Sequence, residues 1–120
     1  MSRAVALLLG EILEAIRLIE RYTAELSFAG FAADLEKQDA VVRRLAVIGQ
    51  AVKGLPEDFR ARYPAVPWRD IAGARDILIH EYFRIDLDLA WEMVRDDLPT
   101  LAVRIREVLR AEGLDEGSAL

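Results

Sequence analysis

The sequence contains no cysteine among its 120 residues and only one histidine. Without cysteine there is no disulfide framework, no thiolate metal cluster and no cysteine nucleophile, which argues against redox chemistry. A reducing compartment, the cytoplasm, is compatible with this composition. Histidine is the one side chain whose unperturbed pKa lets it accept and return a proton near neutral pH. It occurs once, at His80.

The sequence also lacks a long uncharged hydrophobic run, so no segment is expected to span a bilayer. The apolar run 4–9 after Arg3 resembles a short signal core. However, Glu11, Glu14 and Arg17 follow it at helical spacing, and no small-residue cleavage site is present. We therefore expect the first turns of an amphipathic helix, in a soluble protein with no membrane partner.

Positive charge is in the minority, with 16 Lys and Arg against 21 Asp and Glu and a net charge of −5. Such a balance argues against a general nucleic-acid-binding protein, which needs an excess of cations to displace counterions. Net charge says little about one cleft, however, and many basic residues fall in the middle of the chain. These are Arg43, Arg44, Lys53, Arg60, Arg62, Arg69, Arg75 and Arg84.

What is present in quantity is apolar residues, at 53%, together with 31% charged residues. This profile and length are typical of one globular domain. Because a small domain leaves much of its surface exposed, the high apolar content indicates burial against a second subunit. We expect a homodimer.

Apolar residues recur at intervals of three and four over residues 5–23, which predicts one long helix. Segment 26–33 contains Ser27, Gly30 and two phenylalanines and is expected to be a break, after which Asp34 caps a second helix. That helix is expected to end at Lys53-Gly54-Leu55-Pro56, with Gly54 in a left-handed terminal conformation.

A third long element is predicted from Trp68 to about Phe83. Asp86 is expected to cap the next helix, Asp97 and Pro99 mark a junction into the last helix, and Gly113 ends it. No alternating strand pattern of useful length is present. We therefore predict an all-α antiparallel helical bundle over residues 1–112, with a flexible tail over 113–120.

The strip 73–83 gathers Arg75, His80 and Tyr82 into eight residues. An imidazole can transfer a proton near neutral pH, and a guanidinium is a fixed positive charge suited to phosphate. On one straight helix, however, Arg75 and His80 would be about 140° apart. Either a bend near 73–80 or two copies of the strip facing each other across a twofold axis would bring them together.

Arg75, His80 and Tyr82 form the pattern R-x4-H-x-Y, which resembles the signature of HEPN-domain ribonucleases, specifically HepT toxins paired with a minimal nucleotidyltransferase (MNT) antitoxin. Flanking segments resemble the same family in order along nearly the whole chain. They are Tyr22-Thr23-Ala24, Gln38-Asp39-Ala40-Val41-Val42-Arg43, Ile48-Gly49, Pro67-Trp68-Arg69-Asp70-Ile71-Ala72-Gly73, Asp86-Leu87 through Trp91, and Asp97-Leu98-Pro99.

The resemblance implies a HEPN-type bundle that dimerises and cleaves RNA, such as tRNA or mRNA, without a metal or other cofactor, by attack of the 2′-hydroxyl on the adjacent phosphate. It implies His80 as general base or acid and Arg75 as the group that stabilises charge on the phosphate. Asp76 is the supporting polar residue beside Arg75. The family would make this chain the toxin of a type VII-like toxin–antitoxin system in the cytoplasm.

By the same resemblance, the antitoxin transfers AMP from ATP to the hydroxyl of Tyr82, and the added phosphate blocks RNA from the cleft. The alternative is a non-catalytic HEPN module that binds nucleotide or the nucleotidyltransferase, which the acidic Asp76 and Glu81 favour. Each residue also has a purely structural interpretation: His80 within a packed helix, Arg75 paired with a neighbouring acid on a solvated face.

Overall fold

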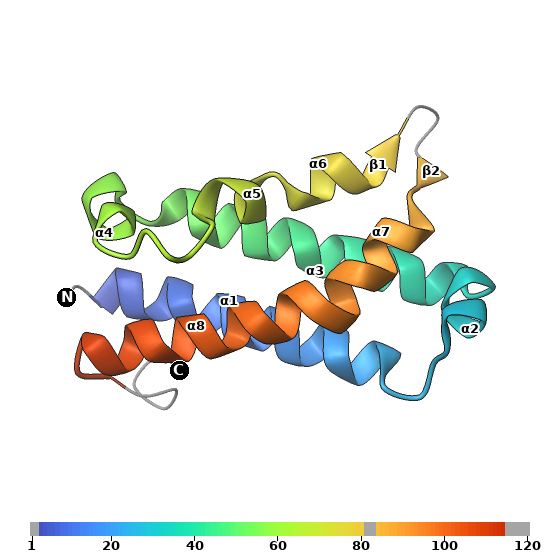
Figure 1. Ribbon diagram of the computed structural model, residues 1–120, viewed down its shortest axis with the longest axis horizontal. Coiled ribbons are helices and arrows are strands. Elements are labelled where there is room, and N and C mark those ends of the chain that lie inside the picture. The colour runs from blue at the N-terminus through green and yellow to red at the C-terminus, as the bar shows by residue number, and fades with distance from the viewer. Residues whose placement is uncertain (1–2, 81–83, 115–120) are drawn as a thin grey trace.

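The computed structural model describes residues 3–80 and 84–114. Within them the chain folds into an antiparallel helical bundle, so the predicted all-α class is confirmed (Figure 1). The long helices are α1 (Arg3–Thr23), α3 (Leu35–Gly54) and α8 (Leu98–Ala111). The shorter elements are α2 (Phe28–Ala32), α4 (Glu57–Ala61), α5 (Trp68–Ala72), α6 (Ala74–Leu78), β1 (Ile79–His80), β2 (Arg84–Ile85), α7 (Leu87–Glu92) and the π-helical η2 (Met93–Asp97).

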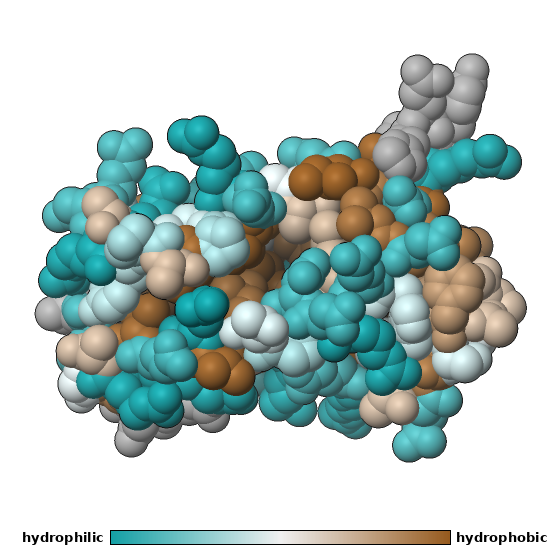
Figure 2. Space-filling model, viewed as in Figure 1, coloured by the Kyte–Doolittle hydropathy of each residue, from teal (hydrophilic) through white to brown (hydrophobic). Residues whose placement is uncertain are grey.

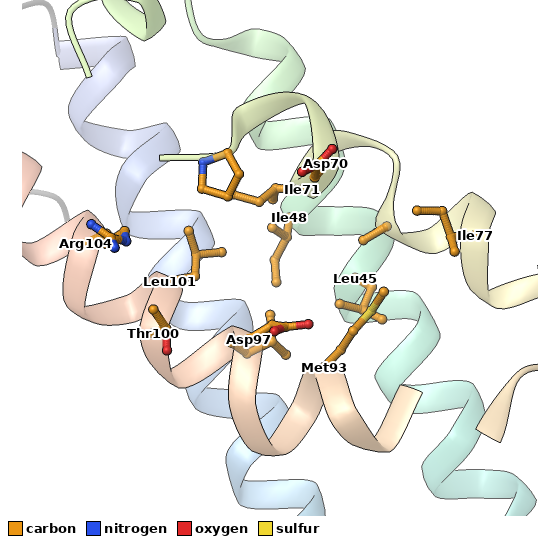
Figure 3. Close-up of a pocket in the computed structure, with 13 residues that line it drawn as sticks. Leu45, Ile48, Asp70, Ile71, Ile77, Met93, Asp97, Thr100, Leu101 and Arg104 are labelled. Carbon is orange, nitrogen blue, oxygen red and sulfur yellow. The ribbon is translucent and has the colours of Figure 1, made fainter. Parts of the chain in front are cut away.

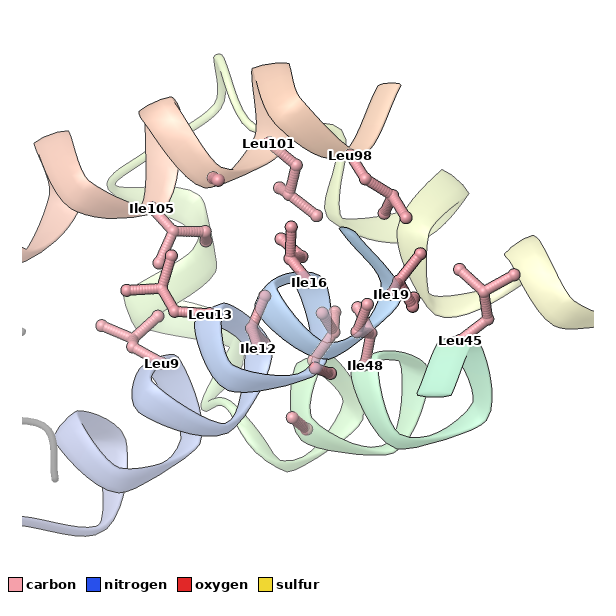
Figure 4. Packing of buried hydrophobic residues seen from close by; sticks show 14 of the residues in the cluster. Leu9, Ile12, Leu13, Ile16, Ile19, Leu45, Ile48, Leu98, Leu101 and Ile105 are labelled. Atoms are coloured by element: carbon pink, nitrogen blue, oxygen red, sulfur yellow. The ribbon is translucent and has the colours of Figure 1, made fainter. Parts of the chain in front are cut away.

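The core forms where α1 packs between α3 and α8 (Figure 4). The predicted helix over residues 5–23 is confirmed as α1, and its periodic apolar residues are the ones that become buried. Ile12, Ile16 and Ile19 of α1 meet Ile48 of α3 and Ile105 of α8, and all five are almost completely buried. Because its inner face is closely packed, α3 is a rigid support for α5 and α6, which contact it.

Short polar side chains start the helices where the sequence predicts caps. The carboxylate of Asp34 accepts a hydrogen bond from the Lys37 N–H at 3.0 Å, and that of Asp86 accepts one from the Leu89 N–H at 3.1 Å. Both predicted caps are confirmed. The predicted break over 26–33 is a break between long helices but contains the one-turn helix α2, capped by Ser27.

The conformation predicted for Gly54 is wrong. Gly54 is the last residue of α3 and has no positive φ; Leu55 follows it in an extended conformation and its N–H bonds to the Val52 carbonyl. A side chain at Gly54 would instead meet Leu8 of α1 at 3.3 Å. Its small size therefore serves the packing of the helices rather than a left-handed cap.

Gly113 is the residue that takes the left-handed conformation, with φ of 78°. Its N–H bonds to the Arg110 carbonyl, and the Leu114 N–H bonds to the Leu109 carbonyl, which completes a Schellman motif. The prediction that Gly113 ends the last helix is confirmed. Most of the predicted tail, residues 115–120, lies outside the described residues, so the domain boundary at 112 stays a prediction.

The predicted long element from Trp68 to Phe83 is wrong as one helix. Gly73 separates α5 from α6, and α6 ends at Leu78, where Ile79 turns to an extended conformation. Ile79 then pairs with Ile85 and His80 with Arg84 in a short antiparallel ladder, and the Asp86 N–H bonds to the Leu78 carbonyl. A local pattern cannot foresee this because the pairing joins residues 79–80 with residues 84–85.

The last helix, α8, begins at Leu98, at the junction predicted from Asp97 and Pro99, but the chain stays helical across it. Helices α7 and α8 form one continuous run through the π-helical turn η2, in which the Leu98 N–H bonds to the Met93 carbonyl. Pro99, which has no N–H to donate, follows at the start of α8. Across the ranges that the structure describes, we find no helix with the length and apolarity needed to cross a membrane.

Candidate active site

Arg75 is exposed on α6 and lines a hollow against the outer face of α3. Its side chain is 49% exposed, and the hollow has a volume of about 560 Å³. The other residues that line the hollow are all on α3: Asp39, Val42, Arg43, Ala46, Val47 and Gln50. Helix α6, whose last residue Leu78 is buried, thus presents the Arg75 guanidinium over the outer face of α3. A phosphate can reach this guanidinium from solvent.

Asp76 lies beside Arg75, with its carboxylate oxygen Oδ1 3.6 Å from Nη1 of the guanidinium. The Asp76 side chain is 74% exposed, so water screens this ion pair and it contributes little to stability. The pairing agrees with the structural interpretation of Arg75 as the partner of a neighbouring acid, and the supporting role of Asp76 stays a prediction. An incoming phosphate can displace such an exposed contact at small cost.

His80 is the second and last residue of β1, which follows α6 directly. Its side chain is not among those that the structure describes, and Tyr82, with Glu81 and Phe83, lies outside the described residues. Since Arg75 and His80 belong to different elements, the 140° offset of a single helix does not apply to them. The bend that the sequence left open lies after Leu78, between Arg75 and His80, while the break at Gly73 precedes both residues.

A second concavity lies on the other side of α6. It is an apolar cleft of about 360 Å³ between α5–α6 and η2–α8, with Leu45 and Ile48 of α3 at its floor (Figure 3). Ile77, two residues after Arg75, lines it and is 52% exposed. Figure 2 shows apolar side chains gathered along this part of the surface. Helix α6 therefore separates a basic hollow from an apolar cleft.

Among the described residues, two carboxyl groups with lowered pKa values belong to the bundle that carries the site. A hydrogen bond from the Tyr63 hydroxyl, helped by the Arg62 guanidinium, lowers the pKa of Glu112 at the end of α8. A hydrogen bond from Arg17 likewise lowers the pKa of Glu14 on α1. Both are surface ion pairs of the scaffold. Within residues 3–80 and 84–114, no group of three or more histidine, aspartate or glutamate side chains is placed to hold a metal ion.

From the sequence, Arg43 is one of several basic residues in the middle of the chain, for which a solvated helix face is the default interpretation and an RNA or partner surface the alternative. The sequence does not connect it with Arg75. A signal was available on α3, because Asp39, Arg43 and Gln50 follow one another at helical intervals on one face. What the sequence could not supply is that α6 packs against this same face.

Comparison with known proteins assigns the chain to a family. A family model described as "Ribonuclease HepT-like" matches residues 12–108. A Thermococcus cleftensis protein named "Probable ribonuclease HepT" is 46% identical over 93 residues, which cover 78% of this chain and 84% of that protein. "Putative RNase MJ0127" of Methanocaldococcus jannaschii is 44% identical over 118 residues, 98% of each chain.

A longer relative contains this chain's counterpart as one part. "Gamma-glutamylcyclotransferase and putative RNase MJ0434" of Methanocaldococcus jannaschii is 44% identical over 116 residues, which are 97% of this chain but 51% of that protein. No solved structure matches the chain significantly. The family match covers α6, β1, β2 and most of α1 and α8, that is, both the candidate site and the bundle that carries it. The chain belongs to the HepT-like ribonuclease family.

Proposed function

We propose that the chain is a metal-independent endoribonuclease and the toxin of a type VII-like toxin–antitoxin system in the cytoplasm. His80 accepts the proton of a ribose 2′-hydroxyl, and the 2′-oxygen attacks the adjacent phosphorus. The bond from phosphorus to the 5′-oxygen of the next nucleotide breaks, and that oxygen takes a proton from an imidazolium. The products are a 2′,3′-cyclic phosphate end and a 5′-hydroxyl end.

Arg75 carries this proposal, since its guanidinium is open to solvent above a hollow and stands five residues before the single histidine. Negative charge accumulates on the phosphate oxygens as the 2′-oxygen attacks, and a fixed cation at hydrogen-bonding distance lowers the energy of that state. The names of the relatives as ribonucleases support the same chemistry.

We further propose that two copies assemble and that each contributes a strip to a composite site. The apolar cleft beside α6 supports this, because an exposed isoleucine and an apolar floor next to the basic hollow are surfaces that a second copy would cover. In such an assembly one imidazole serves as base while the other, protonated, serves as acid.

The decisive experiment incubates purified, unmodified protein with single-stranded RNA in excess chelator. We expect cleavage that leaves 2′,3′-cyclic phosphate and 5′-hydroxyl ends, because the attacking nucleophile is the substrate's own 2′-hydroxyl. Replacement of a single ribose by deoxyribose 5′ to a cut site is expected to abolish that cut and leave the others. Products with 3′-hydroxyl ends, or cleavage that the chelator stops, would contradict the mechanism.

Tyr82 is the proposed site of control. A cognate nucleotidyltransferase with ATP is expected to transfer AMP to its hydroxyl, and the intact mass should rise by one or more adenylyl groups. Added phosphate beside Arg75 and His80 would compete with RNA for the same cations, so cleavage should stop. Tyr82→Phe should prevent the mass increase. Tyr63→Phe, which removes a tyrosine hydroxyl from the segment after α4, should not. Modification that persists in Tyr82→Phe would refute the assignment.

A second candidate function is a non-catalytic module that binds nucleotide or the nucleotidyltransferase through the same strip. The observation in its favour is the acidic Asp76 within 3.6 Å of Arg75, together with the net charge of −5. The cleavage assay separates the two functions, because the module binds but yields no cyclic phosphate ends.

A further inference from the structure

Two guanidinium groups from different elements share the hollow above α3. Arg75 projects from α6 and Arg43 from α3, and both line the same surface depression. They are 32 positions apart in the sequence, so only the packing of α6 on α3 brings them to one surface. Among the described residues Arg43 forms no ion pair or side-chain hydrogen bond, and it is exposed. Its charge is therefore available to a ligand.

The rest of the hollow suits a sugar–phosphate chain. Val42, Ala46 and Val47 give it a floor of small apolar side chains, and Gln50 adds an amide that can donate and accept hydrogen bonds. Asp39 is the one acidic lining residue. Two cations over an apolar floor, rather than a broad basic face, form an arrangement that fits a single strand better than a duplex.

Arg43 is also held on a rigid support. It lies between the buried residues Val41 and Leu45 on α3, whose inner face packs against α1 in the core. A cation on a long core helix keeps a constant position relative to Arg75, which is what alignment of a substrate requires.

We propose that Arg43 is a substrate-positioning residue that binds a phosphate of single-stranded RNA flanking the phosphate held by Arg75. This inference rests on the proposed ribonuclease function. Arg43 does not contact the reacting atoms; it fixes where along the strand the Arg75 guanidinium engages. Asp39, which also lines the hollow, opposes phosphate binding and limits the affinity.

The test measures binding of an uncleavable oligonucleotide, RNA with every 2′-hydroxyl methylated, over a series of salt concentrations. Each phosphate contact with a single strand contributes a slope of about 0.7 to the dependence of log affinity on log salt. We expect Arg43→Ala to reduce the slope by about 0.7. The ratio of wild-type affinity to Arg43→Ala affinity should then be about eightfold larger at 50 mM salt than at 1 M salt. Arg43→Lys should keep the slope, and Asp39→Asn should strengthen binding.

Lys53→Ala is the matched control, because Lys53 is exposed on the same helix, outside the hollow, and its loss changes the net charge equally. Equal slopes for wild type and Arg43→Ala, an equal loss in Lys53→Ala, or no binding by the wild type would overturn the inference. Cleavage of unmodified RNA is measured separately. If Arg43→Ala loses slope while the wild type cuts nothing, the ribonuclease proposal fails and the phosphate contact stands.

Discussion

His80→Ala is expected to cleave RNA about 10²- to 10⁴-fold more slowly than the wild type, which is the usual contribution of a positioned general acid or base. The chain offers no second histidine to replace it. Arg75→Ala is expected to lose about 10²- to 10³-fold, because it removes a fixed cation from the charged phosphate but leaves proton transfer in place. Single-turnover rates on one defined RNA measure both losses without interference from product release.

The control for Arg75→Ala is Arg69→Ala, which removes the same charge from an exposed position on the neighbouring helix α5. We expect this variant to retain nearly full activity, since Arg69 does not line the hollow. Circular dichroism and thermal unfolding show whether each variant remains folded. If the folded His80→Ala protein cuts at the wild-type rate, or if Arg69→Ala is as inactive as Arg75→Ala, the assigned chemistry is wrong.

The sequence predicts those parts of the fold that depend on interactions between residues a few positions apart. Asp34 and Asp86 bond to N–H groups three residues ahead, and the apolar spacing of α1 reports its buried face directly. Gly113 similarly completes a hydrogen-bond pattern within its own helix. Such features need no knowledge of the rest of the chain.

The parts that the sequence does not predict depend on partners distant in the chain. Helix α6 ends at Leu78 because β1 pairs with β2, and the role of Gly54 becomes visible only when Leu8 is placed beside it. The same holds for the candidate site. The motif locates Arg75, but Arg43 joins it only through the packing of α6 on α3.

Packing of α3 against α5 holds this site in place, and Gly49 is a point of close approach between the two helices. A Cβ atom added at Gly49 would lie 2.9 Å from the carbonyl oxygen of Ala72, the last residue of α5. That oxygen belongs to the backbone and cannot rotate away as the end of a side chain could. Relief of the clash therefore requires movement of α5, and Arg75 follows only three residues after Ala72.

Gly49→Ala is accordingly expected to destabilise the fold by about 1–3 kcal/mol, the usual cost of overpacking, less the helix-propensity gain of at most about 1 kcal/mol. Thermal unfolding should show a Tm lower by about 4 °C for each kcal/mol. Since α5 leads into α6, cleavage should fall even at temperatures where the variant is fully folded.

Gly30→Ala supplies the matched comparison, because the added Cβ would meet Leu26 and Ser27 at 3.5 Å, an ordinary contact, within the short helix α2. There the same substitution should leave stability unchanged or raise it by up to about 1 kcal/mol, since alanine restricts the unfolded chain more than glycine does. The opposite signs at two helical glycines would show that the contact with α5 decides the outcome at Gly49. A Gly49→Ala protein as stable and active as Gly30→Ala would mean that α5, and Arg75 with it, is free to shift, and the hollow would then lack the fixed geometry on which both arginine assignments depend.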